Sequence, residues 1–155
     1  MTRLWIFLHL LGFTWWLGGG FAVMLAGIAA RGEDRAGLGA VVRAQAKIHQ
    51  VAILPGVLLA VLSGVLLTFG LSSRIAGFNT WLVIMQGAGI VAGLLALFVS
   101  VPTASKLARL DPVANAGVFD ELRARQKVVS SIWGTLGLLA LLGGAMVRFV
   151  GPMAS

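Results

Sequence analysis

Cysteine and tyrosine are absent from this 155-residue chain, and only five of its residues are Asp or Glu. The lack of cysteine excludes disulfides, thiolate metal sites and redox-active thiols. No acid lies near either of the two histidines in sequence, so neither a hydrolytic triad nor a catalytic carboxylate pair is apparent. The chain also has no phosphate-binding loop and no nucleotide fingerprint. Most soluble-enzyme chemistry is therefore excluded.

Charged residues of either sign are also scarce. They make up 11% of the chain, against 59% hydrophobic residues, whereas about a quarter of a typical soluble domain is charged. Such a chain has too few charged residues to cover a water-exposed surface, and we expect part of its surface to lie in lipid. The net charge is +7, but no basic stripe alternates with aromatic residues, so we expect no nucleic-acid partner. The Lys and Arg residues are better explained as contacts to lipid headgroups at helix ends.

Long uncharged stretches fill most of the sequence. A helix rises about 1.5 Å per residue, so about 20 apolar residues cross the hydrocarbon core of a bilayer. Four stretches qualify, at about residues 4–30, 48–71, 79–102 and 124–148. We predict an all-α protein, an integral membrane antiparallel four-helix bundle, with a single transmembrane domain over residues 1–155. The first stretch could instead be a signal peptide, but its apolar run is far longer than a signal core, and we expect a retained helix.

The basic residues predict the orientation of the bundle. The connections 31–50 and 102–127 hold nine of the twelve Lys and Arg, and the opposite side holds Arg3, Arg74 and Arg148. The positive-inside rule then places both longer connections in the cytoplasm and both termini on the outer side. We expect a bacterial inner membrane protein. Residues 36–50 and 120–127 are predicted to be helical extensions of the second and fourth spans.

Small residues recur every four positions within three of the spans. This spacing favours close helix packing, and a slot for a flat cofactor is the alternative. The residues concerned are Ala52, Gly56, Ala60 and Gly64, then Gly89 and Gly93, then Ser130, Gly134, Ala140 and Gly144. Pro55 frees one backbone carbonyl and predicts a kink. Trp5, Trp81 and Trp133 are expected at the interface or facing lipid.

His9 and His49 are the candidate ionisable residues within the spans, where such residues default to a functional hypothesis. Histidine in a membrane four-helix bundle can be an axial ligand of haem iron. His9 lies near the outer end of the first span and His49 at the inner end of the second, roughly 20 Å apart along the membrane normal. We therefore expect that the two histidines of one chain do not share a haem.

Three other residues are predicted at the depth of His9, namely Gln86, Met85 and Met146. Histidine with methionine can hold haem or the soft ion Cu(I). His9, Phe13, Trp16 and Gly20 share one helical face, with a gap expected at Gly19 and Gly20. The alternative for His9 is a single hydrogen bond, to Gln86 or to a backbone carbonyl.

His49 lies in a basic segment at the predicted inner surface. It is either a ligand or a headgroup-level histidine beside Lys47. Arg43 and Lys47 are candidates to pair with haem propionates or lipid phosphates.

The segment from His9 to Gly19, His-Leu-Leu-Gly-Phe-Thr-Trp-Trp-Leu-Gly-Gly, resembles the first-helix signature of HemJ/CopD-like membrane proteins. Pro55 with Gly64, Trp81-Leu82, and the tail from Met146 to Arg148 followed by Pro152 are similar to the other helices of that family. The resemblance implies a bundle of four or five helices. Its HemJ branch implies haem b and oxidation of protoporphyrinogen, and its CopD branch implies copper. The lysine that the HemJ pattern places soon after Trp-Leu is missing from residues 81–86.

Three functions follow as hypotheses. The first is a haem b-binding membrane protein with His9 as ligand, engaged in redox or porphyrin chemistry, and as an enzyme it would be an oxidoreductase of protoporphyrinogen-oxidase-like type. The second is copper binding or transport by His9 or His49 with Met85 or Met146. The third is a non-catalytic subunit of a larger membrane complex. A homodimer is a further possibility, because one chain supplies too few ligands for two bis-histidine haems.

Overall fold

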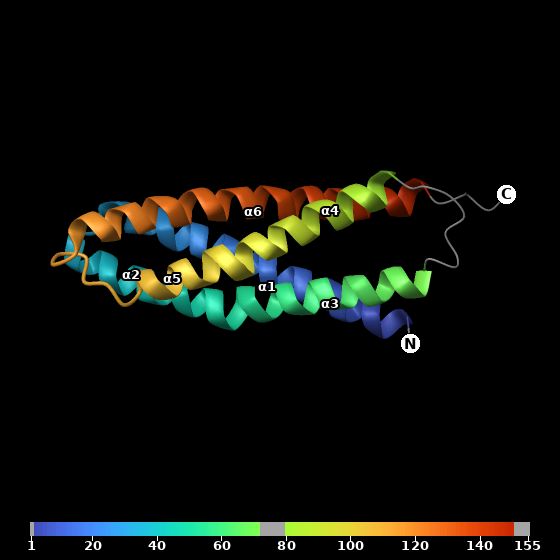
Figure 1. The fold of residues 1–155 in the computed structure, drawn as a ribbon, viewed down its shortest axis with the longest axis horizontal. Coiled ribbons are helices and arrows are strands. Elements are labelled where there is room, and N and C mark those ends of the chain that lie inside the picture. Colours follow the sequence, from blue (N-terminus) through green and yellow to red (C-terminus); the bar gives the residue numbers. More distant parts are fainter. Residues whose placement is uncertain (1, 72–79, 151–155) are drawn as a thin grey trace.

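The computed structural model describes residues 2–71 and 80–150, and its regular structure over these residues is entirely helical. Four antiparallel rods form one elongated bundle (Figure 1). The first rod is α1 (Thr2–Ala29) with the short 3₁₀ turn η1 (Ala30–Gly32), and the second is α2 (Arg35–Ile48), η2 (His49–Ile53) and α3 (Leu54–Leu71). The third is α4 (Thr80–Leu95), η3 (Ala96–Ser100) and α5 (Val101–Leu107), and the fourth is α6 (Ala116–Val150). The connection at 72–79, with Arg74, and the segment 151–155, with Pro152, lie outside the described residues.

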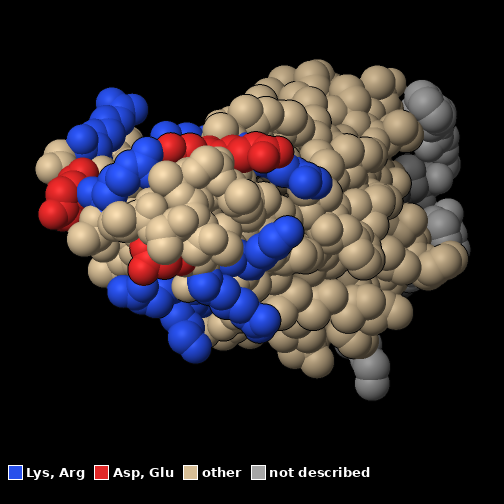
Figure 2. Space-filling model, turned by 60° about the vertical axis from the view of Figure 1, so that its left-hand side comes forward, with Lys and Arg blue, Asp and Glu red and all other residues tan. Residues whose placement is uncertain are grey.

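Each rod is long and apolar enough to cross a membrane. α1 begins and α6 ends at one end of the bundle, the terminal end, while α2, α5 and the start of α6 form the other, the loop end (Figure 1). Charged side chains gather at the loop end, and the visible flank of the rods is uncharged (Figure 2). Large apolar side chains such as Phe7, Leu62 and Phe98 are exposed along the rods. This distribution is that of an integral membrane protein.

Polar contacts fix the helix starts at the loop end. Asp34 caps α2, and its Oδ1 accepts a hydrogen bond from the Gly37 N–H at 2.7 Å. Arg35 bridges to the turn before α6, donating to the Pro112 carbonyl at 3.1 Å and forming an ion pair with Asp120 at 2.6 Å. The predicted helical extensions at 36–50 and 120–127 are confirmed, since α2 starts at Arg35 and α6 at Ala116.

Two widened turns interrupt the second and third rods. In η2 the Leu54 N–H bonds to the His49 carbonyl, and in η3 the Val101 N–H bonds to the Ala96 carbonyl, five residues back in each case. A proline follows directly in both, Pro55 and Pro102. Proline lacks an N–H, and its ring clashes with the carbonyl four residues earlier, so a π turn relieves the helix at this point. The third span was predicted to end at about residue 102, but the widened turn lets the helix continue to Leu107.

α1 and α3 touch through their backbones. A Cβ added at Gly56 would lie 2.6 Å from the Trp16 backbone nitrogen, and one added at Gly12 would lie 2.5 Å from that of Ala60. Only glycine permits this approach. The small residues of the second span therefore pack against α1. Gly134, by contrast, has no atom of the described chain near its missing Cβ.

The centre of the bundle is built around two indoles. Trp16 and Trp133 are 0% and 2% exposed, and their rings stack with centroids 6.0 Å apart. The expectation that Trp133 lies at the interface or faces lipid is wrong. Gly20 explains the difference, because a Cβ there would lie 2.7 Å from the Trp133 ring, so the glycine leaves room for the indole.

Candidate functional site

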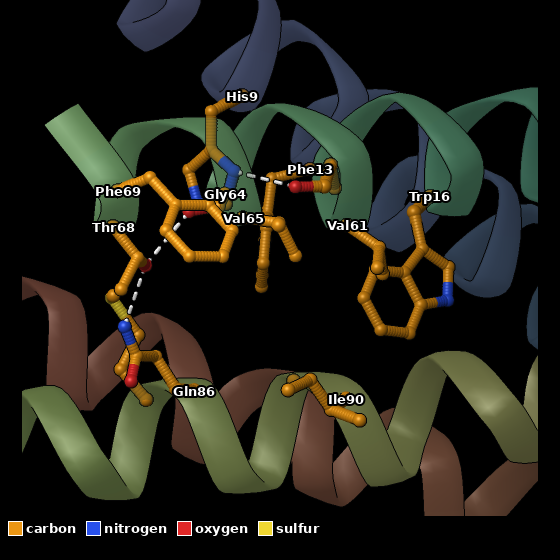
Figure 3. A pocket seen from close by; sticks show the side chains of 13 residues that line it. His9, Phe13, Trp16, Val61, Gly64, Val65, Thr68, Phe69, Gln86 and Ile90 are labelled. Carbon is orange, nitrogen blue, oxygen red and sulfur yellow. Dashed lines mark hydrogen bonds between the residues drawn. The ribbon is translucent and has the colours of Figure 1, made fainter.

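A pocket of about 250 Å³, which we name the His9 pocket, opens between α3 and α4 in the terminal half of the bundle (Figure 3). α1 contributes His9, Phe13 and Trp16 to its wall, and α4 contributes Met85, Gln86, Gly89 and Ile90. The lining from α3 runs from Ala60 to Phe69. Phe69 and Ile90 are themselves exposed, so the mouth of the pocket faces sideways, toward the surrounding lipid of a membrane-embedded bundle.

The missing side chain of Gly64 leaves space for the His9 imidazole to reach the pocket. A Cβ at Gly64 would lie 3.0 Å from His9 Cε1, so the imidazole packs directly against the backbone of α3 at a position that has no side chain. The ring then stands on the α3 side of the pocket, with Gln86 and Ile90 opposite on α4 (Figure 3). The centroid of the Phe13 ring lies 5.8 Å from that of His9, and the centroid of the Trp16 ring lies 5.4 Å from that of Phe13. Aromatic side chains thus form the deep wall of the pocket.

A backbone hydrogen bond sets the tautomer of His9. Nδ1 lies 2.8 Å from the Ala60 carbonyl oxygen, which can only accept, so Nδ1 carries the proton and donates it. The Ser63 hydroxyl lies 3.3 Å from the same nitrogen and itself donates to the Leu59 carbonyl. Nε2 therefore holds the lone pair in the neutral ring. An N–H bonded to a carbonyl is the usual support of a histidine that binds metal through its other nitrogen.

Gln86 does not pair with His9, although it lines the same pocket. Its amide donates to the Thr68 hydroxyl at 2.7 Å, and Thr68 donates to the Gly64 carbonyl at 2.9 Å. This link joins α4 to α3 beside the mouth of the pocket. Of the two alternatives open for a hydrogen bond of His9, the structure has the backbone carbonyl.

The two methionines predicted near His9 differ in position. Met85 lines the pocket, and its sulfur packs over Gly144, where a Cβ would lie 3.0 Å away. Met146 is 36% exposed and does not line the pocket. Gly19 also lies elsewhere, with Ala52 and Ile53 filling the space beside it.

His49 belongs to a second site, closer to the loop end, which we name the His49 cluster. The imidazole is 0% exposed, so it is not the headgroup-level histidine considered as an alternative. Its Nδ1–H donates to the Gln45 carbonyl at 2.8 Å, and Nε2 accepts from Gln126 at 2.9 Å and from Ser100 at 3.1 Å. Since His9 meets α3 at Ala60, eleven residues beyond His49, the two imidazoles lie in separate sites.

Gln126 and Ser100 were not singled out from the sequence, and Ser130 was identified only as a small residue suited to helix packing. Gln126 also donates to Ser100 at 2.7 Å, and it lies one turn before Ser130 on α6. Its Oε1 is buried without a hydrogen-bond partner, as are the indole nitrogens of Trp16 and Trp133. The sequence did contain a signal, because Gln126, Ser130 and Trp133 recur at helical spacing on the span facing His49. Gln126 was missed because the segment 120–127 was interpreted as a charged helical extension of the fourth span.

Arg43 and Lys47 lie on α2 with exposed side chains, away from the His9 pocket. Over the described residues no group of three or more His, Cys, Asp or Glu side chains could hold a metal ion. A ligand of the His9 pocket would thus rely on a single histidine with Met85 or Gln86 nearby.

No family model matches the chain, and neither any curated protein nor any solved structure matches it. Over residues 2–71 and 80–150 the structure has four helices of membrane-spanning length and a lateral pocket that is lined by a histidine.

Proposed function

We propose that the chain is a haem b-binding membrane protein in which His9 Nε2 is the protein ligand of the iron. The observation that carries the proposal is the hydrogen bond from His9 Nδ1 to the Ala60 carbonyl, which leaves Nε2 without a hydrogen bond to any described residue in an apolar pocket. Bound haem would supply one-electron chemistry, and the resemblance of the first helix to HemJ/CopD-like proteins agrees with such a role. The chain would take part in membrane redox or porphyrin reactions.

The residues of the pocket fit such a group in three respects. Gly64 provides a flat, side-chain-free surface beside the imidazole, and Phe13 and Trp16 provide an aromatic wall. Met85 is a soft donor within the same lining and could serve as the second ligand. The pocket volume of about 250 Å³ is slightly below the usual range of small-molecule sites. A porphyrin would therefore be only partly enclosed, and its remainder would reach the lipid-facing mouth.

Copper binding is the second proposal, because His9 and Met85 share the pocket and Cu(I) favours such soft ligands. A non-catalytic subunit of a larger complex is the third, and it predicts co-purification with partners and no bound cofactor. An orientation with both termini outside, and a place in a bacterial inner membrane, remain part of the leading proposal.

Absorption spectra of the full-length protein, expressed with haem supplied, test the leading proposal. We expect a Soret band and sharp bands on reduction in the wild type, and their loss in His9→Ala. His49→Gln is the matched control, since it removes the other histidine, outside the pocket, and should retain the bands. A wild type without a Soret band, or a spectrum unchanged by His9→Ala, contradicts the proposal. Stoichiometric copper without haem would favour the second.

A further inference from the structure

A second cavity, of about 370 Å³, lies at the loop end between α2 and the turn that leads from α5 to α6. We name it the loop hollow. From α2 it is lined by Ala36, Gly39 and Arg43, and from the turn by residues 108–113, which include Arg109 and Asp111. The structure thus brings together two arginines that are 66 positions apart in the sequence. Both lie where apolar rods end, at the level expected for lipid headgroups.

Neither Arg43 nor Arg109 forms an ion pair with another described residue. Within the described residues the only ion pair joins Arg35 to Asp120, outside the hollow. The Arg43 guanidinium folds back over Gly39, where a Cβ would lie 3.2 Å from Nη1 and 3.4 Å from Pro112. Arg35 holds the facing wall by its hydrogen bond to the Pro112 carbonyl. Gly39 and Pro112 therefore shape one side of the cavity, and neither of its arginines is held in an ion pair with a described residue.

One carboxylate also lines the hollow. Asp111 Oδ1 accepts hydrogen bonds from the Val113 and Ala114 N–H groups at 2.7 and 3.0 Å. Two arginines and one aspartate leave a net charge of +1 in the lining. A singly charged anion neutralises that charge, whereas a doubly charged one exceeds it. The balance favours a phosphodiester over free inorganic phosphate.

The rest of the lining is apolar. Ala36, Ala108, Leu110, Pro112 and Val113 surround the two arginines, and Val113 is 62% exposed. An exposed valine beside unpaired guanidinium groups suits a ligand that carries hydrocarbon next to its negative charge. We propose that the loop hollow binds the phosphodiester headgroup of an anionic phospholipid, with Arg43 and Arg109 contacting the phosphate oxygens. This inference is independent of any cofactor in the His9 pocket.

Native mass spectrometry of the full-length protein, titrated in detergent with phosphatidylglycerol or phosphatidylcholine, tests the proposal. We expect the wild type to retain phosphatidylglycerol in preference to phosphatidylcholine. The double variant Arg43→Gln/Arg109→Gln should bind phosphatidylglycerol about tenfold or more weakly. The control pair Arg31→Gln/Arg125→Gln removes the same charge from exposed residues outside the hollow and should change binding by less than about threefold.

A hollow-filling variant separates a shaped site from general charge attraction. Gly39→Val retains every charge but occupies the space over which the Arg43 guanidinium lies, so binding should fall as in the double arginine variant. Gly39→Ala is the milder form if valine prevents folding, as judged by circular dichroism and gel filtration. Equal losses in the two arginine pairs, no preference between the lipids, or full displacement of lipid by millimolar inorganic phosphate would each overturn the proposal.

Discussion

Glycine determines where side chains and backbones can meet in this bundle. Gly64 lets the His9 imidazole pack against the backbone of α3, and Gly20 leaves room for the Trp133 ring. Gly12 and Gly56 allow backbone contact between α1 and α3. In the first-helix motif, Trp16 and Gly19 are packed inside, while Gly18 faces open space. Neighbouring glycines of one motif therefore have different roles, which the sequence alone does not distinguish.

Gly64→Val should weaken cofactor binding without removing a ligand. The added side chain would collide with His9 Cε1 and turn the imidazole away from the Ala60 carbonyl. Loss of such an orienting hydrogen bond lowers affinity by about 10–100-fold. Haem titration monitored at the Soret band measures the effect. Gly87→Val, at a position on α4 where no atom of the described residues lies near the missing Cβ, is the control and should leave the affinity unchanged.

Gly56→Ala should destabilise the fold by about 1–3 kcal/mol, because its Cβ would meet the α1 backbone and push the helices apart. Gly18→Ala adds the same methyl group at a position with no atom of the described part of the chain within 4 Å, and it should be neutral or slightly stabilising, since alanine favours helix. Thermal unfolding in detergent compares the two. Equal destabilisation would show that the α1–α3 contact is looser than described.

Among the elements, the two π turns explain how the second polar site arises. η2 begins at His49 and η3 ends at Ser100, and the side chains of these two residues are hydrogen-bonded across the rods. Each turn contains one residue more than an α-helical turn of the same height, which rotates the flanking segments relative to each other. Pro55 and Pro102 are visible in the sequence, but their joint effect on His49 and Ser100 depends on tertiary contact.

A double-mutant cycle measures the coupling within the His49 cluster. Gln126→Leu leaves the buried His49 Nε2 with only Ser100 as a donor, and His49→Leu leaves the Gln126 amide with fewer acceptors. Each should cost about 1–3 kcal/mol of unfolding free energy. The double variant should cost clearly less than the sum, because both buried polar partners are then gone.

The exposed Gln50→Leu change, which removes only a 3.5 Å contact to Ser105, is the matched control and should stay within about 0.5 kcal/mol. Additive effects of His49→Leu and Gln126→Leu would contradict the hydrogen bond between them.

The turn between α5 and α6 predicts a local dependence on pH. Hydrogen bonds from the backbone N–H groups of Ala114 and Val113 lower the pKa of the exposed Asp111 carboxyl below its ordinary value. The charged carboxylate thus supports the turn above the ordinary pKa of about 3.9, and this support is lost as the pH falls through the lowered value. Hydrogen exchange of the two amides should accelerate in Asp111→Asn relative to wild type at pH 6. Unchanged protection would show that the carboxylate adds nothing to the turn.

For the whole molecule, hydropathy alone predicted four long apolar helices in an antiparallel bundle, because membrane spans need length and a lack of charge more than detailed packing. It did not predict which polar residues meet. His9 and Gln86 do line one pocket, but Gln126 fell in the charged extension 120–127, and Trp133 was expected at the interface or facing lipid. Their burial depends on glycines and π turns in other rods, which periodicity within one helix does not reveal.

Single cysteines report the orientation directly, since the chain has none of its own. We expect Gly117→Cys, at the loop end, to react with a membrane-impermeant maleimide only after the cells are permeabilised, because the basic loop end should face the cytoplasm. Arg3→Cys, at the terminal end, should react in intact cells. The reverse pattern would show that both termini lie inside and that the positive-inside rule fails for this chain.

Among the described residues, hydrogen bonds join the first two rods to the last two in both halves of the bundle. Toward the loop end they involve Arg35, His49 and Gln50, and in the terminal half Gln86 bonds to Thr68. The bond between Gln86 and Thr68 lies beside the mouth of the His9 pocket. A ligand that enters the pocket between α3 and α4 would therefore meet these two polar side chains before it reaches the imidazole.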